Sequence, residues 1–231
     1  MESEEALTES GPGSVRKDKD PADLAIKVAL VGDAAVGKTS LRQRLAEGAH
    51  SPVYQATAGV ECGACSVDMA GCQVQLQLWD MAGHERCRDL ICKYHSGCDA
   101  VLVVYDITCR DSFYHVPRWI HQVRATSDKS PTIALVGNKA DQGDSRRVSA
   151  EEGRNLADGL GLAFLETSAS TGSMVREAFL GACEEALARR RRMKEESEAA
   201  EMHDTVREGQ KVGAAGLRLV VTGMAGEVVQ E

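Results

Sequence analysis

A glycine-rich stretch near the start of the chain has the residue types and spacing of a phosphate-binding loop. An apolar run ends at Gly32, four residues follow, and Gly37-Lys38-Thr39 then opens a segment of helical composition, as in G-x-x-x-x-G-K-[ST]. Glycines let the backbone bend around an anion, and the N–H groups that begin a helix attract negative charge. Lys38 adds a positive charge, and Thr39 offers a hydroxyl that can ligate Mg²⁺. The residues expected to cradle the phosphates are Gly32, Asp33, Ala34, Ala35, Val36, Gly37, Lys38, Thr39 and Ser40.

Three further motifs each follow an apolar, strand-like run. Asp80 to Gly83 fits D-x-x-G, in which the carboxylate can hold Mg²⁺ through water and the glycine N–H can face a terminal phosphate. Asn138 to Asp141 fits N-K-x-D, in which the Asp141 carboxylate can accept hydrogen bonds from N1–H and the exocyclic amine of guanine. Adenine does not offer that pair of donors, so the motif argues against an ATPase. Ser168 and Ala169 follow the last expected strand, where a backbone N–H can reach the guanine oxygen.

Strands that alternate with helices are expected to bring these motifs together. Short apolar runs typical of buried parallel strands cover 25–32, 100–106, 132–137 and 162–166, and alternating residues predict a hairpin around Ala70-Gly71. Helical patterns lie between them, at 37–46, 85–95, 113–123, 149–158 and 175–186. Pro117 should kink or delay the third helix, and Ser149 with Glu152 predicts a capping box. This order predicts an α/β fold with a doubly wound, mostly parallel six-stranded sheet and one antiparallel strand, whose ligands bind at the carboxyl ends of the strands.

The composition and net charge of the chain argue against several classes of protein. The chain has 231 residues, 43% of them hydrophobic, and a net charge of −8, which argues against general nucleic-acid binding. No apolar run is long enough to span a membrane, and 1–23 lacks the apolar segment of a secretory signal. We therefore expect a cytoplasmic protein with a disordered acidic leader at 1–23, one domain at 24–187, and a helical extension with a disordered tail at 188–231. Its eight cysteines are expected to be reduced thiols.

Taken together, the motifs resemble those of the Ras superfamily of small GTPases, and within it the Rab branch. The resemblance covers about 24–187, and its Rab character rests on the runs 79–86 and 102–108, on Ser112-Phe113 and on Trp119. It implies a switch that binds GTP with Mg²⁺, hydrolyses it slowly to GDP and acts in vesicle trafficking. It also implies effector, exchange-factor and GTPase-activating partners, with membrane association at most indirect, through a partner.

Site residues are carried over by position from that resemblance. Lys38 would contact the phosphates, Gly83 would sense the terminal phosphate, and the metal ligands would be Thr39, Thr57 and Asp80. His84 occupies the position of the family's water-orienting glutamine, so we expect it to serve as a poorer catalytic residue and hydrolysis to be slow. The guanine pocket would be formed by Asn138, Lys139, Asp141, Ser168 and Ala169.

Several other positions depart from the family pattern. Ala35 replaces a common loop glycine, and Cys62 replaces a phenylalanine on the effector-facing strand. His50 and Ser170 replace an aromatic residue and a lysine that usually cover the base, which predicts faster nucleotide release. These changes leave open an alternative function, a hydrolysis-impaired GTP-binding scaffold that acts through protein partners.

Two local patterns have more than one interpretation. Cys62, Cys65 and Cys72 suggest zinc, but residues three apart on a strand point to opposite faces and no fourth ligand is near. The basic run 189–192, followed by glutamates, fits either an anionic-surface patch or a solvated helix with ion pairs, and we favour the helix. No cysteine follows Cys183, so the prenylation site typical of Rab proteins is not found in the tail.

Overall fold

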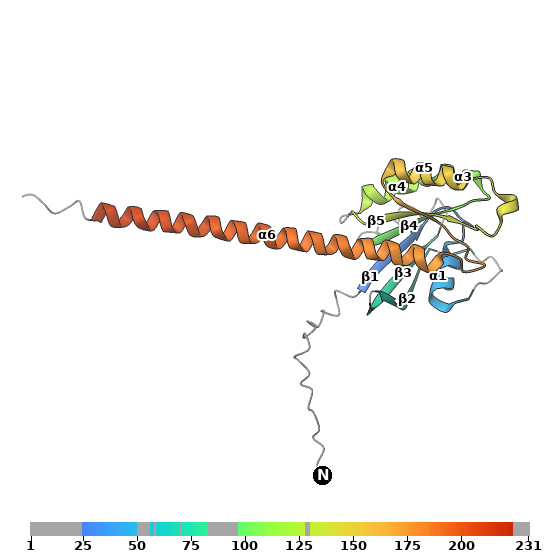
Figure 1. The fold of residues 1–231 in the computed structure, drawn as a ribbon, viewed down its shortest axis with the longest axis horizontal. Helices are drawn as coiled ribbons and strands as arrows, with labels where there is room; N and C mark the ends of the chain where they lie inside the picture. Colours follow the sequence, from blue (N-terminus) through green and yellow to red (C-terminus); the bar gives the residue numbers. More distant parts are fainter. Residues whose placement is uncertain are drawn as a thin grey trace, which may run out of the picture.

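Six strands form one sheet in the computed structural model, in the order β2-β3-β1-β4-β5-β6 (Figure 1). The structure describes residues 25–49, 56–57, 59–69, 71–82, 97–127 and 130–223, with the backbone alone from residue 200 onward. Only β2 runs antiparallel within these ranges, paired with β3 from Val60 opposite Met81 to Met69 opposite Cys72. The strands are β1 (Ala25–Val31), β2 (Val60–Met69), β3 (Cys72–Met81), β4 (Ala100–Asp106), β5 (Thr132–Asn138) and β6 (Ala163–Glu166). The predicted α/β fold with one antiparallel strand is confirmed.

Helices cover both faces of this sheet (Figure 1). The helix α1 and the first part of α6 pack on one face, where Leu41 and Phe179 meet the side chains of β1, β3 and β4. The helices α4 and α5 cover the other face with Trp119, Ile120 and Ala157 among their buried residues. The helices are α1 (Lys38–Glu47), α3 (Arg110–Tyr114), α4 (Val116–Thr126), α5 (Ala150–Leu160) and α6 (Val175–Gly223), with a 3₁₀ turn at Gly143–Ser145.

Burial explains why the central strands are parallel and continuous in apolar character. Every residue of β4 is buried, and β1 is buried from Val28 to Val31, because both strands have neighbours on each side and helices on each face. The carboxyl ends of β1, β4 and β5 consequently meet at one edge of the sheet. This edge receives the loops that carry the predicted motifs.

Two local predictions about helix ends are confirmed. The helical pattern around Pro117 splits into α3 and α4, and α4 begins one residue before this proline, which occupies its first turn. A proline is tolerated there because the first N–H groups of a helix have no intrahelical partner. The helix α5 starts with a complete capping box, in which Glu152 N–H donates to Ser149 Oγ and Ser149 N–H donates to the Glu152 carboxylate.

The last helix extends well beyond the sheet. The helix α6 projects away from the domain (Figure 1) and continues to Gly223, into the stretch that the sequence predicts to be a disordered tail. Arg190 fastens it to the sheet by donating to Asp99 Oδ1 at 2.9 Å and to Ala25 O at 3.0 Å, and Arg192 pairs with Glu185 at 3.0 Å. Because these two arginines bond within the protein, the contacts favour a helix with ion pairs over an anionic-surface patch.

Candidate nucleotide-binding site

The predicted phosphate loop connects β1 to α1 and curls in front of the helix. Gly32 has φ of +139° and Gly37, which precedes the helix, has φ of +96°, both in the region that favours glycine. A Cβ at Gly32 would lie 2.1 Å from Val104 O, so this glycine lets the loop leave the sheet against β4. Lys38 folds back over the loop and donates from Nζ to Gly32 O at 2.9 Å and to Asp33 O at 2.6 Å.

The Lys38 ammonium is nearly enclosed. Only 6% of the residue is exposed, and burial lowers the pKa of Lys38 to about 8, although Asp80 and Asp33 act in the opposite direction. An ammonium in this position lacks full hydration, so an anion that enters the loop gains a strong electrostatic contact. The arrangement suits the binding of phosphate oxygens.

Two hydroxyls and a carboxylate meet beside the loop. Thr39 Oγ1 lies 2.8 Å from Thr57 Oγ1 and donates a short hydrogen bond to Asp80 Oδ2. Asp80 is fully buried, and burial raises the pKa of its carboxyl group against the opposing effects of Thr39 and Lys38. Among the described residues, none gives a hydrogen bond to its other oxygen, Oδ1. An unpaired buried carboxylate oxygen beside two hydroxyls fits the oxygen ligands that Mg²⁺ prefers.

The loop after β5 is tied to the phosphate loop through Asn138. Its Nδ2 donates to Val36 O at 2.9 Å, and its Oδ1 accepts from the backbone N–H of Ala169 at 3.3 Å. Ser168 Oγ donates to Asp141 Oδ1 at 2.5 Å, so the loop after β6 also supports the carboxylate. One buried asparagine thus joins three loops that lie far apart in the sequence.

Lys139 lies across the same edge of the sheet. It has φ of +68°, an uncommon value for a residue with a side chain, and its ammonium pairs with Asp106 at 2.6 Å. The pair joins the end of β4 to the loop after β5.

Most predicted site residues converge on this edge. Among the described residues, the carboxyl ends of β1, β3, β5 and β6 bring together the predicted phosphate loop with Lys38, the oxygens of Thr39, Thr57 and Asp80, and the two candidate guanine loops, which follow β5 and β6. Gly83 and His84, two of the three predicted catalytic residues, lie outside the described residues, as do His50 and the helix expected at 85–95.

Arg44 is a site residue that the sequence did not reveal. From α1 its guanidinium donates to Ala169 O at 2.8 Å and to Ser170 O at 2.6 Å, which joins α1 to the loop after β6, the candidate guanine loop. An arginine in a largely polar helix is ordinarily a solvated residue, and the spacing of Arg44 relative to other residues gives no hint of a partner 125 positions away.

We expect Arg44→Ala to speed the release of bound GDP about tenfold, because two charge-assisted hydrogen bonds that hold the guanine loop are lost. The measurement is displacement of a fluorescent GDP analogue by excess GDP. Arg44→Lys is the matched control: it keeps the charge but cannot bond both carbonyls through one planar group, so its rate should fall in between. Release at the wild-type rate from Arg44→Ala would contradict this role.

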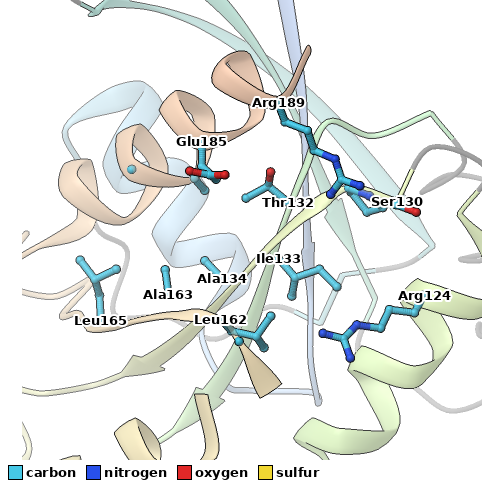
Figure 2. Close-up of a pocket in the computed structure, with 14 residues that line it drawn as sticks. Arg124, Ser130, Thr132, Ile133, Ala134, Leu162, Ala163, Leu165, Glu185 and Arg189 are labelled. Atoms are coloured by element: carbon cyan, nitrogen blue, oxygen red, sulfur yellow. The ribbon is translucent and has the colours of Figure 1, made fainter. Parts of the chain in front are cut away.

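A separate cavity lies at the opposite edge of the sheet. It lies between α6, the starts of β5 and β6, and the end of α4 (Figure 2). Its volume is about 720 Å³. Its apolar floor includes Ile133 and Leu162, and Arg124, Arg189 and Glu185 stand around it (Figure 2). Nucleotides bind wound sheets at the carboxyl ends of the strands, so this cavity is distinct from the candidate site.

Two negative findings apply to the described ranges. No set of three or more His, Cys, Asp or Glu side chains there is grouped to hold a metal ion, and none of Cys62, Cys65 and Cys72 forms a disulfide. Among the same residues, no helix combines the length and apolar character needed to cross a membrane.

The wound sheet, with a phosphate loop at its carboxyl edge, defines a P-loop nucleotide-binding protein. The Ras family model matches residues 27–188 of the chain. The chain is also 39% identical over 170 residues to Ras-related protein RABA4b of Arabidopsis thaliana, covering 74% of this chain and 76% of that protein. It is 37% identical over 159 residues to Ras-related protein Rab-8B of Dictyostelium discoideum, covering 69% and 78%. The chain therefore belongs to the Ras family of small GTPases, in its Rab branch.

Proposed function

We propose that this protein is a Rab-type molecular switch that binds GTP with Mg²⁺, hydrolyses GTP slowly to GDP and acts in vesicle trafficking. Membership of the family supports GTP binding and GTPase chemistry. The observation that carries the proposal is the hydrogen bond from Asn138 Nδ2 to Val36 O, because it joins the candidate guanine loop to the phosphate loop in one site.

Phosphate and metal binding are assigned to the first half of the site. Lys38 and the backbone N–H groups of 32–40 would hold the phosphates, and Gly83 would contact the terminal one. Thr39, Thr57 and Asp80 would hold Mg²⁺, and the unpaired Asp80 Oδ1 supports this set. When bound, the ion neutralises charge on the phosphates.

Recognition of the base is assigned to the second half. The Asp141 carboxylate would accept from guanine N1–H and the exocyclic amine, and the backbone at Ser168 and Ala169 would donate to the guanine oxygen. The Ala169 N–H, which bonds Asn138 Oδ1 at 3.3 Å, would then be shared between these two acceptors. Ser168 already donates to Asp141, which holds the carboxylate in a single orientation and lowers the cost of ordering it on binding. Lys139 would cover the base with its stem.

Competition between nucleotides tests this proposal directly. Purified full-length protein, loaded with fluorescent GDP in the presence of Mg²⁺, should release it to excess GTP but not to excess ATP. Removal of Mg²⁺ by EDTA should accelerate that release, because the phosphates then lose the positive charge of the ion that the protein holds against them. Equal competition by ATP and GTP would contradict the proposed guanine site.

The rate of hydrolysis depends on His84 in this proposal. An imidazole differs from the family's glutamine in shape and reach, so it orients the attacking water poorly. We expect His84→Gln to raise the single-turnover rate of GTP cleavage at least about tenfold. His121→Gln, the same substitution at an exposed position of α4, is the control and should leave the rate unchanged. Equal rates in the wild type and in His84→Gln would remove the claim that His84 slows hydrolysis.

The alternative is a hydrolysis-impaired scaffold that binds GTP and acts through protein partners. The observation that favours it is Ala35, which adopts φ of +63° where relatives commonly have glycine. Multiple-turnover phosphate release, with and without a GTPase-activating protein, separates the two functions. A switch should turn over faster with the activating protein, whereas a scaffold should remain loaded with GTP.

Partners and location follow from the same proposal. Effectors, exchange factors and GTPase-activating proteins would bind the segments around the terminal phosphate, whereas the acidic composition gives no support for nucleic-acid binding. A cytoplasmic location, peripheral to membranes through a protein partner, stays a prediction from the sequence.

A further inference from the structure

Both carboxylate oxygens of Asp33, the second residue of the predicted phosphate loop, are held by side chains at the start of α4. The Trp119 indole Nε1 donates to Oδ1 at 2.8 Å, and His115 Nδ1 lies 2.7 Å from Oδ2. His115 is the residue that precedes α4, and Trp119 is 4% exposed in the core beneath it. We call Asp33, His115 and Trp119 the Asp33 cluster. It joins the loop to a helix that supplies none of the proposed nucleotide contacts.

The Asp33 cluster lies at one end of a strained stretch of backbone. At the other end, Val36 O accepts the hydrogen bond from Asn138. Between these two points lie Ala34 and Ala35, and Ala35 has φ of +63°. A left-handed conformation costs alanine free energy that glycine does not lose, and such a residue persists only where its surroundings fix it. Side chains from outside the loop hold both ends of the stretch in this way.

The main chain of Asp33 also contributes to the proposed phosphate site. Its carbonyl oxygen accepts from Lys38 Nζ at 2.6 Å, in addition to the bond from Lys38 to Gly32 O. A rotation of the peptide at Asp33 would therefore move both the bond to Lys38 and the N–H groups that follow in the loop. The Asp33 carboxylate is the part of the residue that lies outside the phosphate cradle and can resist this rotation.

We propose that His115 and Trp119 are positioning residues of the nucleotide site. By holding the Asp33 carboxylate, they keep the loop with its strained Ala35 in the conformation in which Lys38 and the backbone N–H groups receive phosphates. The two side chains touch no part of the nucleotide themselves. This inference rests on the proposed nucleotide binding and adds to it a dependence of nucleotide retention on the start of α4.

Dissociation of a fluorescent GDP from the full-length, Mg²⁺-loaded protein tests this proposal. Trp119→Phe removes the indole donor but keeps an aromatic ring in the core, and we expect it to speed release about tenfold. His115→Ala should act in the same direction. His115→Asn, which presents an N–H donor close to the position of Nδ1, should release GDP at a rate close to that of the wild type. His121→Ala, at an exposed position on the same helix, is the matched control.

The strain at Ala35 provides a second, independent measurement. Relief of this strain by Ala35→Gly should make the loop depend less on the Asp33 cluster. In the Ala35→Gly background, Trp119→Phe should therefore change the GDP release rate by about twofold or less, so the two substitutions should not combine multiplicatively. If Trp119 acts only through core packing, Trp119→Phe should change the GDP release rate by the same factor with and without Ala35→Gly.

The outcomes distinguish the proposals. Thermal unfolding shows whether each variant folds, and Asp33→Asn, which loses one acceptor at a partly exposed position, tests the cluster without a change in the core. If Asp33→Asn and Trp119→Phe release GDP at the rate of His121→Ala, the positioning role is wrong although GTP binding stands. An equal effect of Trp119→Phe on GDP release with and without Ala35→Gly would also overturn the positioning role. If the unmodified chain binds no GDP, the proposed function is overturned together with the positioning role.

Discussion

Asp141→Ala is expected to lower the affinity for GTP and GDP about 1,000-fold while the fold is retained. Two hydrogen bonds from guanine to a carboxylate contribute about 1.5–3 kcal/mol each, and a loss of about 4 kcal/mol corresponds to a factor of about 1,000. Asp141 is exposed, and it accepts a hydrogen bond from Ser168. Its removal should therefore affect the unfolding free energy much less than the binding free energy.

Asp141→Asn separates loss of the site from a change of its specificity. The asparagine amide offers one acceptor and one donor, which match the N1–H and the neighbouring carbonyl of xanthine, so this variant should prefer XTP over GTP. Titration of both variants with GTP, XTP and ATP measures the effect, with thermal unfolding as the check on the fold. Wild-type affinity for GTP in Asp141→Ala would show that guanine binds elsewhere.

Gly32→Ala is expected to lower the free energy of unfolding by about 3 kcal/mol, from a steric clash together with backbone strain. The added Cβ would lie 2.1 Å from Val104 O, in the backbone of a buried central strand that cannot yield. The φ of +139° adds strain for any residue with a side chain. Denaturant unfolding of the nucleotide-free protein at equilibrium measures the change.

Gly161→Ala is the matched control for this steric effect. Gly161 ends α5 with φ of +66°, and a Cβ there would meet no atom within 4 Å, so this variant reports strain alone, at about 1 kcal/mol. Gly37→Ala should behave differently from both, because its Cβ would lie 2.3 Å from Asn138 Nδ2 and would disturb the bridge to Val36. Equal destabilisation by Gly32→Ala and Gly161→Ala would mean that β4 accommodates the added methyl group.

Ala35 illustrates where sequence reasoning about the site reached its limit. The sequence shows that alanine replaces a common loop glycine there, and the φ of +63° in the structure shows that the backbone is strained at this position. The side chains that hold the loop at Asp33 come from α4 and the residue before it, more than 80 positions along the chain. Neither His115 nor Trp119 belongs to a spacing pattern that points to phosphate chemistry, so only their position in space reveals the contact.

The sequence by itself determined the order of the strands and helices that the structure describes, the antiparallel hairpin, the capping box at Ser149 and the motifs that follow the strands. These features depend on apolar periodicity, on turn chemistry and on short spacings along the chain, which are local properties. The tertiary structure alone decided that Asn138 bridges three loops, that Arg44 holds the loop after β6 and that α6 is fastened through Arg190. Such contacts depend on the distances between elements after packing, and a linear sequence of residues does not contain those distances explicitly.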